Sequence, residues 1–247
     1  MEFNITHTNF RKAFGWSWRL YTHTLLKLNH DLLNDIFNNE GFVLEVGTST
    51  WSQLGTIFKN ATRIDLGFFS RSPQQKAKIK KFLEREFKSL INIKVKECNF
   101  EKIEGKYNII IMKSVLGGIY REKKSSLNDV QSGIENVINN NLFPGGYLVT
   151  LDNGKSLIHK FSSNFGTRKI NWRFFNSESL KNKYIVGQET FGLLSIFSLQ
   201  KRIPFFGSFI DSIIYYLDRI IFPISSCFFS DGSVIVSVYK NKIDILK

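Results

Sequence analysis

Short apolar segments alternate with amphipathic helical segments along most of this 247-residue chain, and this alternation constrains the fold more than any other feature. Five short apolar runs are typical of buried strands, at residues 42–46, 62–66, 93–95, 107–112 and 147–151. Helical periodicity separates them, most clearly over residues 73–91 and 130–138. Strands joined through helices favour right-handed βαβ units and a mostly parallel sheet.

The two ends of the chain complete this architecture. Residues 1–40 have a helical apolar stripe, and two more strands are expected at residues 191–199 and 233–240. A long apolar helix at 203–222 separates those two strands. We therefore predict an α/β fold: a Rossmann-like, seven-stranded, mostly parallel sheet with helices on both faces, an N-terminal helical segment, and a helix inserted between the last two strands.

The turn after the first strand is the most informative short stretch. Gly47 opens directly into a helix-like segment, so a ligand can approach the backbone and face the N-terminus of that helix. Asp65 follows Gly47 by 18 residues and is expected at the tip of the next strand, where an acidic side chain reaches the ribose hydroxyls of a nucleoside cofactor. Ser49 and Trp51 depart from the G-x-G-x-x-G pattern, which argues against a pyrophosphate cradle.

Four motifs in a fixed order extend this pattern: VLEVGTST at 43–50, IDL at 64–66, KYNIII at 106–111 and LFPGGYL at 142–148. In order and spacing they resemble the class I S-adenosylmethionine-dependent methyltransferases. The resemblance implies S-adenosylmethionine as the cofactor and one methyltransferase domain over 1–247, with an N-terminal helical segment (1–40), a cofactor-binding core (41–152) and a substrate-side segment (153–247).

The same resemblance implies a set of cofactor contacts. Residues of the first turn would line the methionine end, residues of the second strand would hold the ribose, and residues after the third strand would lie beside the adenine. In that order the implied residues are Glu45, Gly47, Thr48 and Ser49; Asp65 and Leu66; Cys98 and Asn99. Two of them depart from the family pattern: Ser49 replaces the second glycine of the turn, and Cys98-Asn99 replaces the acidic residue common after the third strand.

Three later segments, KSVLGG at 113–118, LDNGKSLIH at 151–159 and NWRFF at 171–175, look like a narrower branch of uncharacterised bacterial methyltransferases often associated with cell-surface glycan synthesis. Lys113 follows the fourth strand and is a candidate to hold the cofactor carboxylate or an acidic substrate, with a solvated loop lysine as the alternative.

The candidate bases and substrate contacts come after the fifth strand. His159 is the candidate base for an oxygen acceptor, with a packing histidine as the alternative. Asp152 is a second candidate base, with a helix cap as the alternative. Trp172 and Arg173 could stack on and clamp a sugar or phosphate, or instead form a core contact and a surface charge. We therefore expect methyl transfer to an oxygen of a small molecule or glycan precursor.

Charge leaves other functions open. Thirty-four Lys and Arg residues against 21 Asp and Glu give a formal net charge of +13, which favours anionic partners. An RNA methyltransferase is therefore an alternative, although nucleic acid is not favoured because the chain lacks an Asn-Pro-Pro-Tyr-like segment and an appended nucleic-acid module. A non-catalytic cofactor-binding protein on the same fold is a third reading.

The segment 203–222 and the cysteine content bear on partners and location. The segment fits a peripheral membrane contact, a homodimer contact, or packing between the last two strands. Two cysteines and four scattered histidines indicate no metal centre, and no secretory signal is evident at the start. A cytoplasmic protein is expected, with the inner membrane face as an alternative location.

Overall fold

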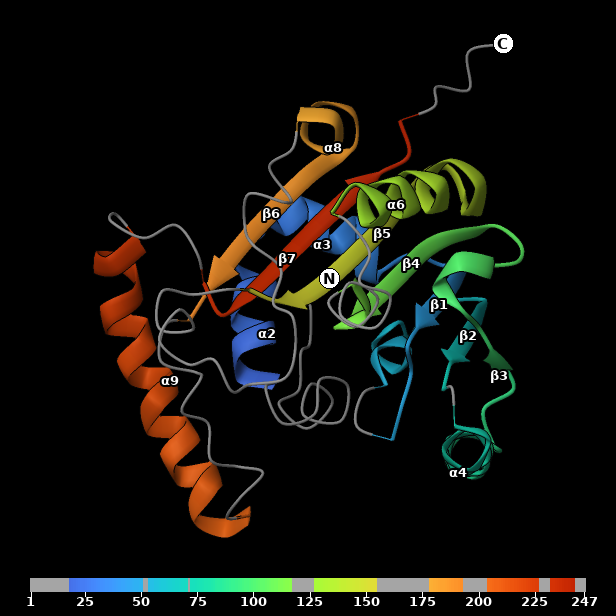
Figure 1. Cartoon of the computed structure of the whole chain (residues 1–247), viewed down its shortest axis with the longest axis horizontal. Helices are drawn as coiled ribbons and strands as arrows, with labels where there is room; N and C mark the ends of the chain where they lie inside the picture. Colours follow the sequence, from blue (N-terminus) through green and yellow to red (C-terminus); the bar gives the residue numbers. More distant parts are fainter. Residues whose placement is uncertain are drawn as a thin grey trace.

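The computed structural model describes residues 18–50, 53–70, 72–116, 127–154, 178–192, 204–226 and 232–242. Its centre is a seven-stranded sheet with the strand order β3-β2-β1-β4-β5-β7-β6 (Figure 1). The strands are β1 (Phe42–Val46), β2 (Arg63–Phe68), β3 (Ile93–Glu97), β4 (Tyr107–Lys113), β5 (Leu142–Asn153), β6 (Ile185–Phe191) and β7 (Val234–Lys240). The first five strands pair in parallel, and β7 runs antiparallel to both β5 and β6. The predicted mostly parallel sheet is confirmed.

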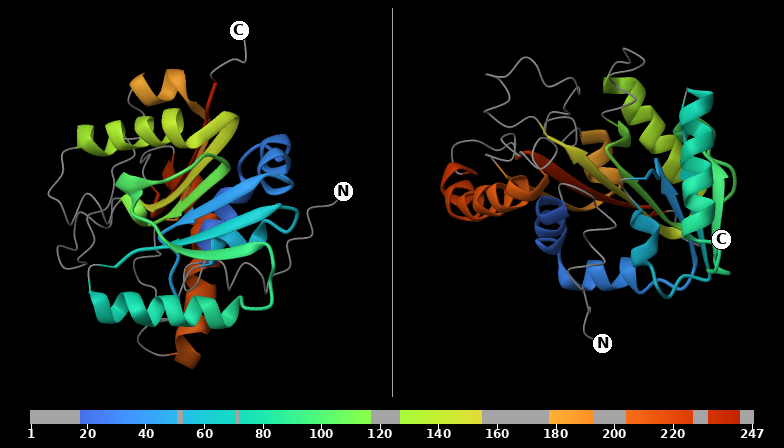
Figure 2. Two further views of the ribbon diagram at one scale, coloured as in Figure 1. Left: turned by 90° about the vertical axis from the view of Figure 1, so that its right-hand side faces the viewer. Right: turned by 90° about the horizontal axis from the view of Figure 1, so that it is seen from below.

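Helices cover both faces of the sheet, as Figure 2 shows from two sides. The buried side chains of α2 (Trp18–Leu26), α3 (His30–Phe37), the 3₁₀ turn η2 (Leu54–Ile57) and α4 (Pro73–Glu86) join one apolar cluster. Those of the 3₁₀ turn η3 (Phe100–Lys102), α6 (Leu127–Asn141) and α8 (Glu178–Lys183) join a second cluster on the opposite face. The two apolar clusters lie on opposite faces because the side chains of successive strand residues point to opposite faces of the sheet.

Local sequence signals explain where the helices begin. The Ser72 hydroxyl accepts a hydrogen bond from the Gln75 N–H at 3.4 Å, and Pro73 occupies the first helical position of α4. Asn29 caps α3 in a similar way by accepting from the Asp31 N–H at 2.8 Å. Both caps satisfy N–H groups that have no partner within the helix.

The Pro-Gly-Gly motif lies inside β5 rather than in a turn before it. Gly145 has φ +77°, and a Cβ on Gly146 would lie 2.9 Å from the carbonyl oxygens of both Asn108 and Phe143. The pairing of β4 with β5 shifts register at this point, between Tyr107 and Ile109. The motif is therefore a β-bulge in which Gly146 has no room for a side chain and Gly145 adopts a left-handed φ.

The sixth strand begins earlier in the sequence than expected, and the long helix between the last two strands is confirmed. β6 is Ile185–Phe191, an edge strand of mostly half-exposed residues, and most of the strand expected at 191–199 lies outside the described residues. Helix α9 (Pro204–Ser226) continues past Pro223 and joins β6 to β7 in the chain. However, β6 and β7 pair directly, so α9 is not buried between them. Figure 1 shows α9 standing outside the sheet, beside α2. Among the described residues, no helix is long and apolar enough to cross a membrane.

The helix expected directly after Gly47 is also not observed. The described part of that segment forms only the 3₁₀ turn η2. Gly55 lies in close contact with the strand below it, since a Cβ there would be 2.7 Å from Leu66 Cδ2 and 2.8 Å from Ile64 Cγ2. The segment therefore follows the sheet surface tightly, and the predicted anion site at a helix N-terminus is wrong.

Candidate functional site

The strand order reverses direction between β1 and β4. The chain builds β1, β2 and β3 outward to one edge, then crosses back to place β4 on the other side of β1. Open α/β sheets bind ligands at such a switch point, outside the carboxyl ends of the strands. The residues that follow β1, β4 and β5 are therefore the place to look for a site.

The turn after β1 closes tightly onto β2. The N–H groups of Gly47 and Thr48 both donate to the carbonyl oxygen of Gly67, at 2.8 and 2.9 Å. Gly47 has φ +86°, a conformation that favours glycine, and a Cβ on it would lie 2.7 Å from Val115 Cγ2. Gly47 therefore lets the Val115 side chain pack directly on the turn, and the ligand approach predicted for Gly47 stays a prediction.

Glu45 lies fully buried beneath this turn. One of its carboxyl oxygens accepts a hydrogen bond from the Gly55 N–H at 2.8 Å, so the residue holds η2 against the sheet. Burial raises its pKa to about 7, although backbone hydrogen bonds, the Thr48 hydroxyl and the charge of Lys113 act in the opposite direction. Near neutral pH this carboxyl therefore exchanges between its neutral and charged forms.

A second polar cluster joins α2 to the ends of β4 and β5. The Tyr21 hydroxyl donates to Asn153 Oδ1 at 3.0 Å and lies 3.3 Å from the Ser114 Oγ. The Asn153 amide also reaches the Ser114 Oγ, at 3.5 Å. Lys113 Nζ lies 4.9 Å from the centre of the Tyr21 ring, where the ammonium gains from the ring electrons. We call Tyr21, Lys113, Ser114 and Asn153 the β4–β5 cluster.

Ser114 has an unusual backbone in this cluster. Its φ of +56° is the one left-handed value of a non-glycine residue in the described part of the chain. Such conformations cost on the order of 1–3 kcal/mol and gather at sites where geometry matters more than stability. The Ser114 N–H donates to the Leu151 carbonyl oxygen at 2.8 Å, which fixes the turn after β4 against β5.

Cys98 and Asn99 follow β3 at the same edge of the sheet. The Cys98 side chain packs on Gly67, since a Cβ on Gly67 would lie 2.7 Å from the Cys98 Cβ. Burial raises the pKa of the Cys98 thiol to about 11, so it is a packing group rather than a nucleophile. Asn99 accepts from the Glu101 N–H at 3.4 Å and begins η3.

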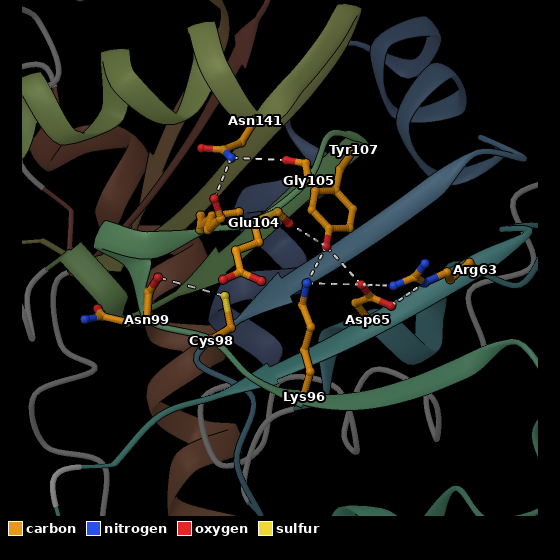
Figure 3. A network of polar contacts seen from close by, with 10 residues as sticks. Arg63, Asp65, Lys96, Cys98, Asn99, Glu104, Gly105, Tyr107 and Asn141 are labelled. Carbon is orange, nitrogen blue, oxygen red and sulfur yellow. Dashed lines mark hydrogen bonds and ion pairs between the residues drawn. The ribbon is translucent and has the colours of Figure 1, made fainter.

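Asp65 lies in a different place from the one expected. β2 continues for three residues beyond it, so Asp65 is not at the strand tip, and it is fully buried. Figure 3 shows its carboxylate surrounded by cations and a phenol. Arg63 donates to both oxygens at 2.7 and 2.8 Å, the Tyr107 hydroxyl donates at 2.9 Å, and Lys96 Nζ lies at 3.2 Å.

The surroundings of Asp65 explain its ionisation. Burial raises the pKa of Asp65, but the hydrogen bonds from Arg63 and Tyr107 and the charge of Lys96 outweigh burial and hold the pKa below its usual value. The register also places Asp65 and Glu45 on opposite faces, because Asp65 pairs with Leu44 and Glu45 pairs with Leu66. The expected tip position of Asp65 is therefore wrong, and its ribose contact stays a prediction.

Other expected site residues fall into three groups. Thr48 is buried in the turn beside Glu45, Ser49 is half-buried, and Leu66 is a core residue that contacts Gly55. Asp152 lies in β5 and is fully buried, and the helix it was expected to cap lies outside the described residues. His159, Trp172 and Arg173 lie outside the described residues.

The charge of Asp152 reaches a neighbouring phenol. Its pairing with Ile235 places it on the α6 face of the sheet, where burial and the Asp152 charge raise the pKa of Tyr239. Within the described ranges no three His, Cys, Asp or Glu side chains come together as a metal site.

Sequence reasoning missed three members of the β4–β5 cluster. Ser114 and Asn153 each follow or end a strand that was predicted correctly, so their position at the carboxyl edge was available from the sequence. Tyr21 gave no such signal. It lies 93 residues from Ser114 and 132 from Asn153, and only the tertiary structure brings it to them.

Several solved structures share this architecture. A S-adenosylmethionine-dependent methyltransferase from Methanosarcina mazei is 11% identical, with 88% of this chain and 99% of that chain covered and a TM-score of 0.52. The chain has the fold of the class I S-adenosylmethionine-dependent methyltransferases. A geranyl diphosphate C-methyltransferase from Streptomyces coelicolor, solved with S-adenosyl-L-homocysteine, gives 13% identity, 85% and 78% coverage and a TM-score of 0.50. No protein-family profile and no curated protein matches the chain.

The methyltransferase fold does not by itself decide the reaction. The cyclase SpnF also shares it, at 13% identity, with 87% of this chain and 80% of that chain covered and a TM-score of 0.51. Identities this low show the fold alone, so the activity of this chain has to be argued from its site residues.

Proposed function

We propose that this chain binds S-adenosylmethionine and transfers its methyl group to an oxygen of a small molecule or glycan precursor. One observation carries the proposal: a glycine turn after β1 and a polar cluster after β4 and β5 converge at the switch point of a methyltransferase sheet. This is where an open α/β sheet holds a ligand, and the donors there suit a zwitterion.

The residues after β1 and β4 fit the methionine end of the cofactor. The Gly47 turn lies at the carboxyl end of β1, where its left-handed φ suits glycine, and Lys113 at the end of β4 offers a cation for the carboxylate. Glu45, with a pKa of about 7, offers a carboxyl that ionises readily beside a cation. Tyr21 and Asn153 hold the turn at Ser114 in place, so they act as positioning residues.

The residues after β2 and β3 fit the adenosine end in part. Cys98 packs against Gly67 at the carboxyl end of β3, the position that the resemblance gives to the adenine contact. The carboxylate of Asp65 already holds Arg63, Tyr107 and Lys96, so a ribose would have to displace one of them. Ser70 is the first hydroxyl after β2, and we propose it as the alternative ribose contact.

The acceptor side follows from the chemistry of an oxygen nucleophile. S-adenosylmethionine supplies an already activated methyl on a sulfonium, so the protein mainly has to position the acceptor. An acceptor hydroxyl must also lose its proton as the carbon–oxygen bond forms, and a base nearby accelerates that step by roughly 10²–10⁴-fold. Asp152 and His159 stay the candidate bases. Asp152 lies near the carboxyl end of β5, and His159 comes after β5 in the sequence.

The first test of the proposal is binding of S-adenosylmethionine and S-adenosyl-L-homocysteine to the full chain, measured by isothermal titration calorimetry. Lys113→Met should raise both dissociation constants by at least about tenfold, because a charge-assisted hydrogen bond is worth about 1.5–3 kcal/mol, or roughly 10- to 150-fold. Lys106→Met is the matched control, since Lys106 precedes the amino end of the same strand. Absence of binding by the unaltered chain would overturn the proposal.

The second test concerns the acceptor atom. Incubation of the chain with methyl-labelled S-adenosylmethionine and a fraction of sugar precursors should give a labelled product. A methyl ether keeps its label in mild base, whereas a methyl ester releases it as methanol. Asp152→Asn and His159→Ala should then lower turnover without changing cofactor affinity. Label that is lost in mild base would contradict an ether product.

A further inference from the structure

Helix α9 exposes an unusual amount of apolar surface. Six of its side chains are large, apolar and between 43% and 67% exposed: Phe209, Ile213, Tyr216, Leu217, Ile220 and Ile224. We call these six the outward face of α9. Single exposed apolar residues are ordinary, but a continuous patch of this kind marks an interaction surface.

The helix is attached to the rest of the molecule by its other side. Phe222 and Asp218 are buried, and Phe222 lies 5.3 Å from the ring of Phe191 in β6. The Tyr215 hydroxyl is 3.1 Å from His23 Nδ1 in α2, and that histidine stacks on Phe191 at 4.1 Å. α9 is therefore docked on α2 and β6 through a narrow strip of side chains. Figures 1 and 2 show the helix in this position, at the outside of the molecule.

Helical geometry puts the outward face opposite this attachment. At about 100° per residue, the six outward residues span an arc of about 100°, and the centre of that arc is about 180° from the centre of Tyr215, Asp218 and Phe222. The three charged residues of the helix, Asp211, Asp218 and Arg219, fall outside the arc by their spacing. The arc is as wide as the face that an ordinary helix buries in a core, and wider than a coiled-coil seam.

The length and width of the outward face bear on what can cover it. Residues 213, 217, 220 and 224 have heptad spacing, but the whole face is wider than a coiled-coil seam needs. A helix of 23 residues is about 35 Å long, yet α9 is not apolar enough to span a bilayer. The geometry suits a helix that lies flat in an apolar layer rather than one that crosses it.

Charge indicates what kind of layer it is. The positive charges of Arg19 and Arg219 lie close enough to Tyr215, which attaches α9, to act toward a lower pKa of its hydroxyl. Lys201 and Arg202 come just before the helix in the sequence. The whole chain has a formal net charge of +13. A basic protein with a flat apolar face is attracted to a surface that is negatively charged and has an apolar interior.

We propose that the outward face of α9 inserts into the interfacial layer of a membrane that contains anionic lipids. Insertion buries the six side chains beside the headgroups, while the attachment through Tyr215 and Phe222 keeps the sheet at the membrane surface. α2 and β6 hold the opposite side of α9, so they then lie on the side of the helix away from the lipid. This places the chain against the membrane whichever reaction it performs.

Vesicle flotation of the full chain tests the proposal. Vesicles of phosphatidylcholine with about 30% phosphatidylglycerol should carry the chain upward at about 0.15 M salt, and pure phosphatidylcholine vesicles should carry several-fold less. The double variant Ile220→Gln, Ile224→Gln should lower the bound fraction at least tenfold, since two apolar side chains no longer leave water. Ile91→Gln is the matched control, because Ile91 is fully exposed in a loop far from α9 in the sequence.

Sedimentation of the same samples separates lipid binding from self-association. A monomer that floats with anionic vesicles, and loses flotation in the double variant but not in Ile91→Gln, supports the proposal. A chain that never floats but sediments as a dimer, with the dimer lost in the double variant, overturns it in favour of a second copy. Equal flotation on both vesicle types overturns the assignment to anionic lipid.

Discussion

At the scale of single residues, two buried acids on neighbouring strands have opposite ionisation. Glu45 meets mostly neutral N–H and hydroxyl groups, and burial raises its pKa to about 7. Asp65 is just as inaccessible, yet Arg63, Tyr107 and Lys96 hold its pKa below the usual value. The partners rather than the depth of burial decide which acid stays charged, and therefore which can respond to a ligand near neutral pH.

Asp65→Asn tests whether Asp65 is structural. The change removes a charge that two cations share, and because Arg63 and Lys96 are 41% and 28% exposed, water compensates in part. We expect a loss of about 1–3 kcal/mol in urea unfolding, with affinity for S-adenosylmethionine changed less than about threefold. Glu84→Gln, at an exposed ion pair with Lys80, is the control and should cost less than about 0.5 kcal/mol. Unchanged stability with a tenfold loss of affinity would instead assign Asp65 to the ribose.

Glu45 should couple cofactor binding to pH. Its pKa in the free protein is about 7, and a bound cation favours the charged form, so affinity for S-adenosylmethionine should rise about tenfold as the pH rises from about 5.5 to 7.5. The free energy of unfolding should change in the opposite direction and fall as the pH rises from 4.5 to about 7. In this range the unfolded chain ionises Glu45 more readily than the folded protein does. Calorimetry across this range checks both, and Glu45→Gln should flatten the affinity profile. A profile that stays steep in the variant assigns the effect to another group.

At the scale of elements, the bulge in β5 and the joint of α9 show how local geometry limits substitution. Gly146 is enclosed by backbone carbonyls of β4 and β5, which cannot move aside. Gly145 has open space where a Cβ would lie, so its left-handed φ is what favours glycine there. Two adjacent glycines in one motif are thus needed for different reasons.

Substitutions at the two glycines should separate these reasons. Gly146→Ala should cost about 2–3 kcal/mol in unfolding free energy, because its Cβ would lie 2.9 Å from two backbone oxygens. Gly145→Asn should cost about 1 kcal/mol or less, since asparagine tolerates a left-handed φ. Denaturant unfolding of both variants gives the comparison. Equal costs would mean that the bulge relaxes around a new side chain.

The joint between α9 and α2 should weaken in acid. Burial, together with the positive charges of Arg219 and Lys27, lowers the pKa of His23. The neutral ring is therefore favoured in the docked state, and the stabilisation it gives is present above about pH 6.5 and is lost as the pH falls. Hydrogen exchange in α9, corrected for intrinsic rates, should be faster near pH 5.5 than near pH 7.5. His23→Gln should remove the difference, and a variant that keeps it would falsify the role of His23.

At the scale of the whole molecule, the candidate site depends on three distant parts of the chain. Tyr21 in α2 contacts Ser114 after β4 and Asn153 at the end of β5, and the strand order brings the last two side by side. The N-terminal helix thereby closes one side of the site. Its contribution should be visible as affinity rather than as stability alone.

Tyr21→Phe tests this closure. Removing the hydroxyl deletes a hydrogen bond worth about 0.5–1.5 kcal/mol, so the dissociation constant for S-adenosylmethionine should rise about three- to tenfold. Tyr147→Phe is the matched control, because the Tyr147 hydroxyl bonds Asp35 at 3.2 Å on the same face but outside the β4–β5 cluster. Both variants should lose similar stability. Equal affinity in both would show that the cluster does not position the cofactor.

Periodicity and glycine placement in the sequence were sufficient for the layered α/β sheet. The first five strands, helices α4 and α6 and the turn at Gly47 are encoded by neighbours in the chain, because burial on one or two faces leaves a local pattern, whereas the helix expected after Gly47 is not observed. The carboxyl-edge position of Lys113 follows from the same pattern. Edge strand β6 left a weaker pattern, because most of its residues are half-exposed.

Tertiary structure alone decided which acid is a partner of which cation, and which side of α9 is covered. Asp65 is not at the strand tip because β2 continues to Phe68. Its partner Arg63 lies two residues earlier on the same strand, but Lys96 of β3 and Tyr107 of β4 reach it from other strands, and spacing along one strand cannot show those contacts. The apolar pattern of α9 fixed that it is a helix with an apolar face, but only docking on α2 and β6 left that face outward. Long-range contacts are set by the packing of the whole sheet, and for that reason they leave no local period in the sequence.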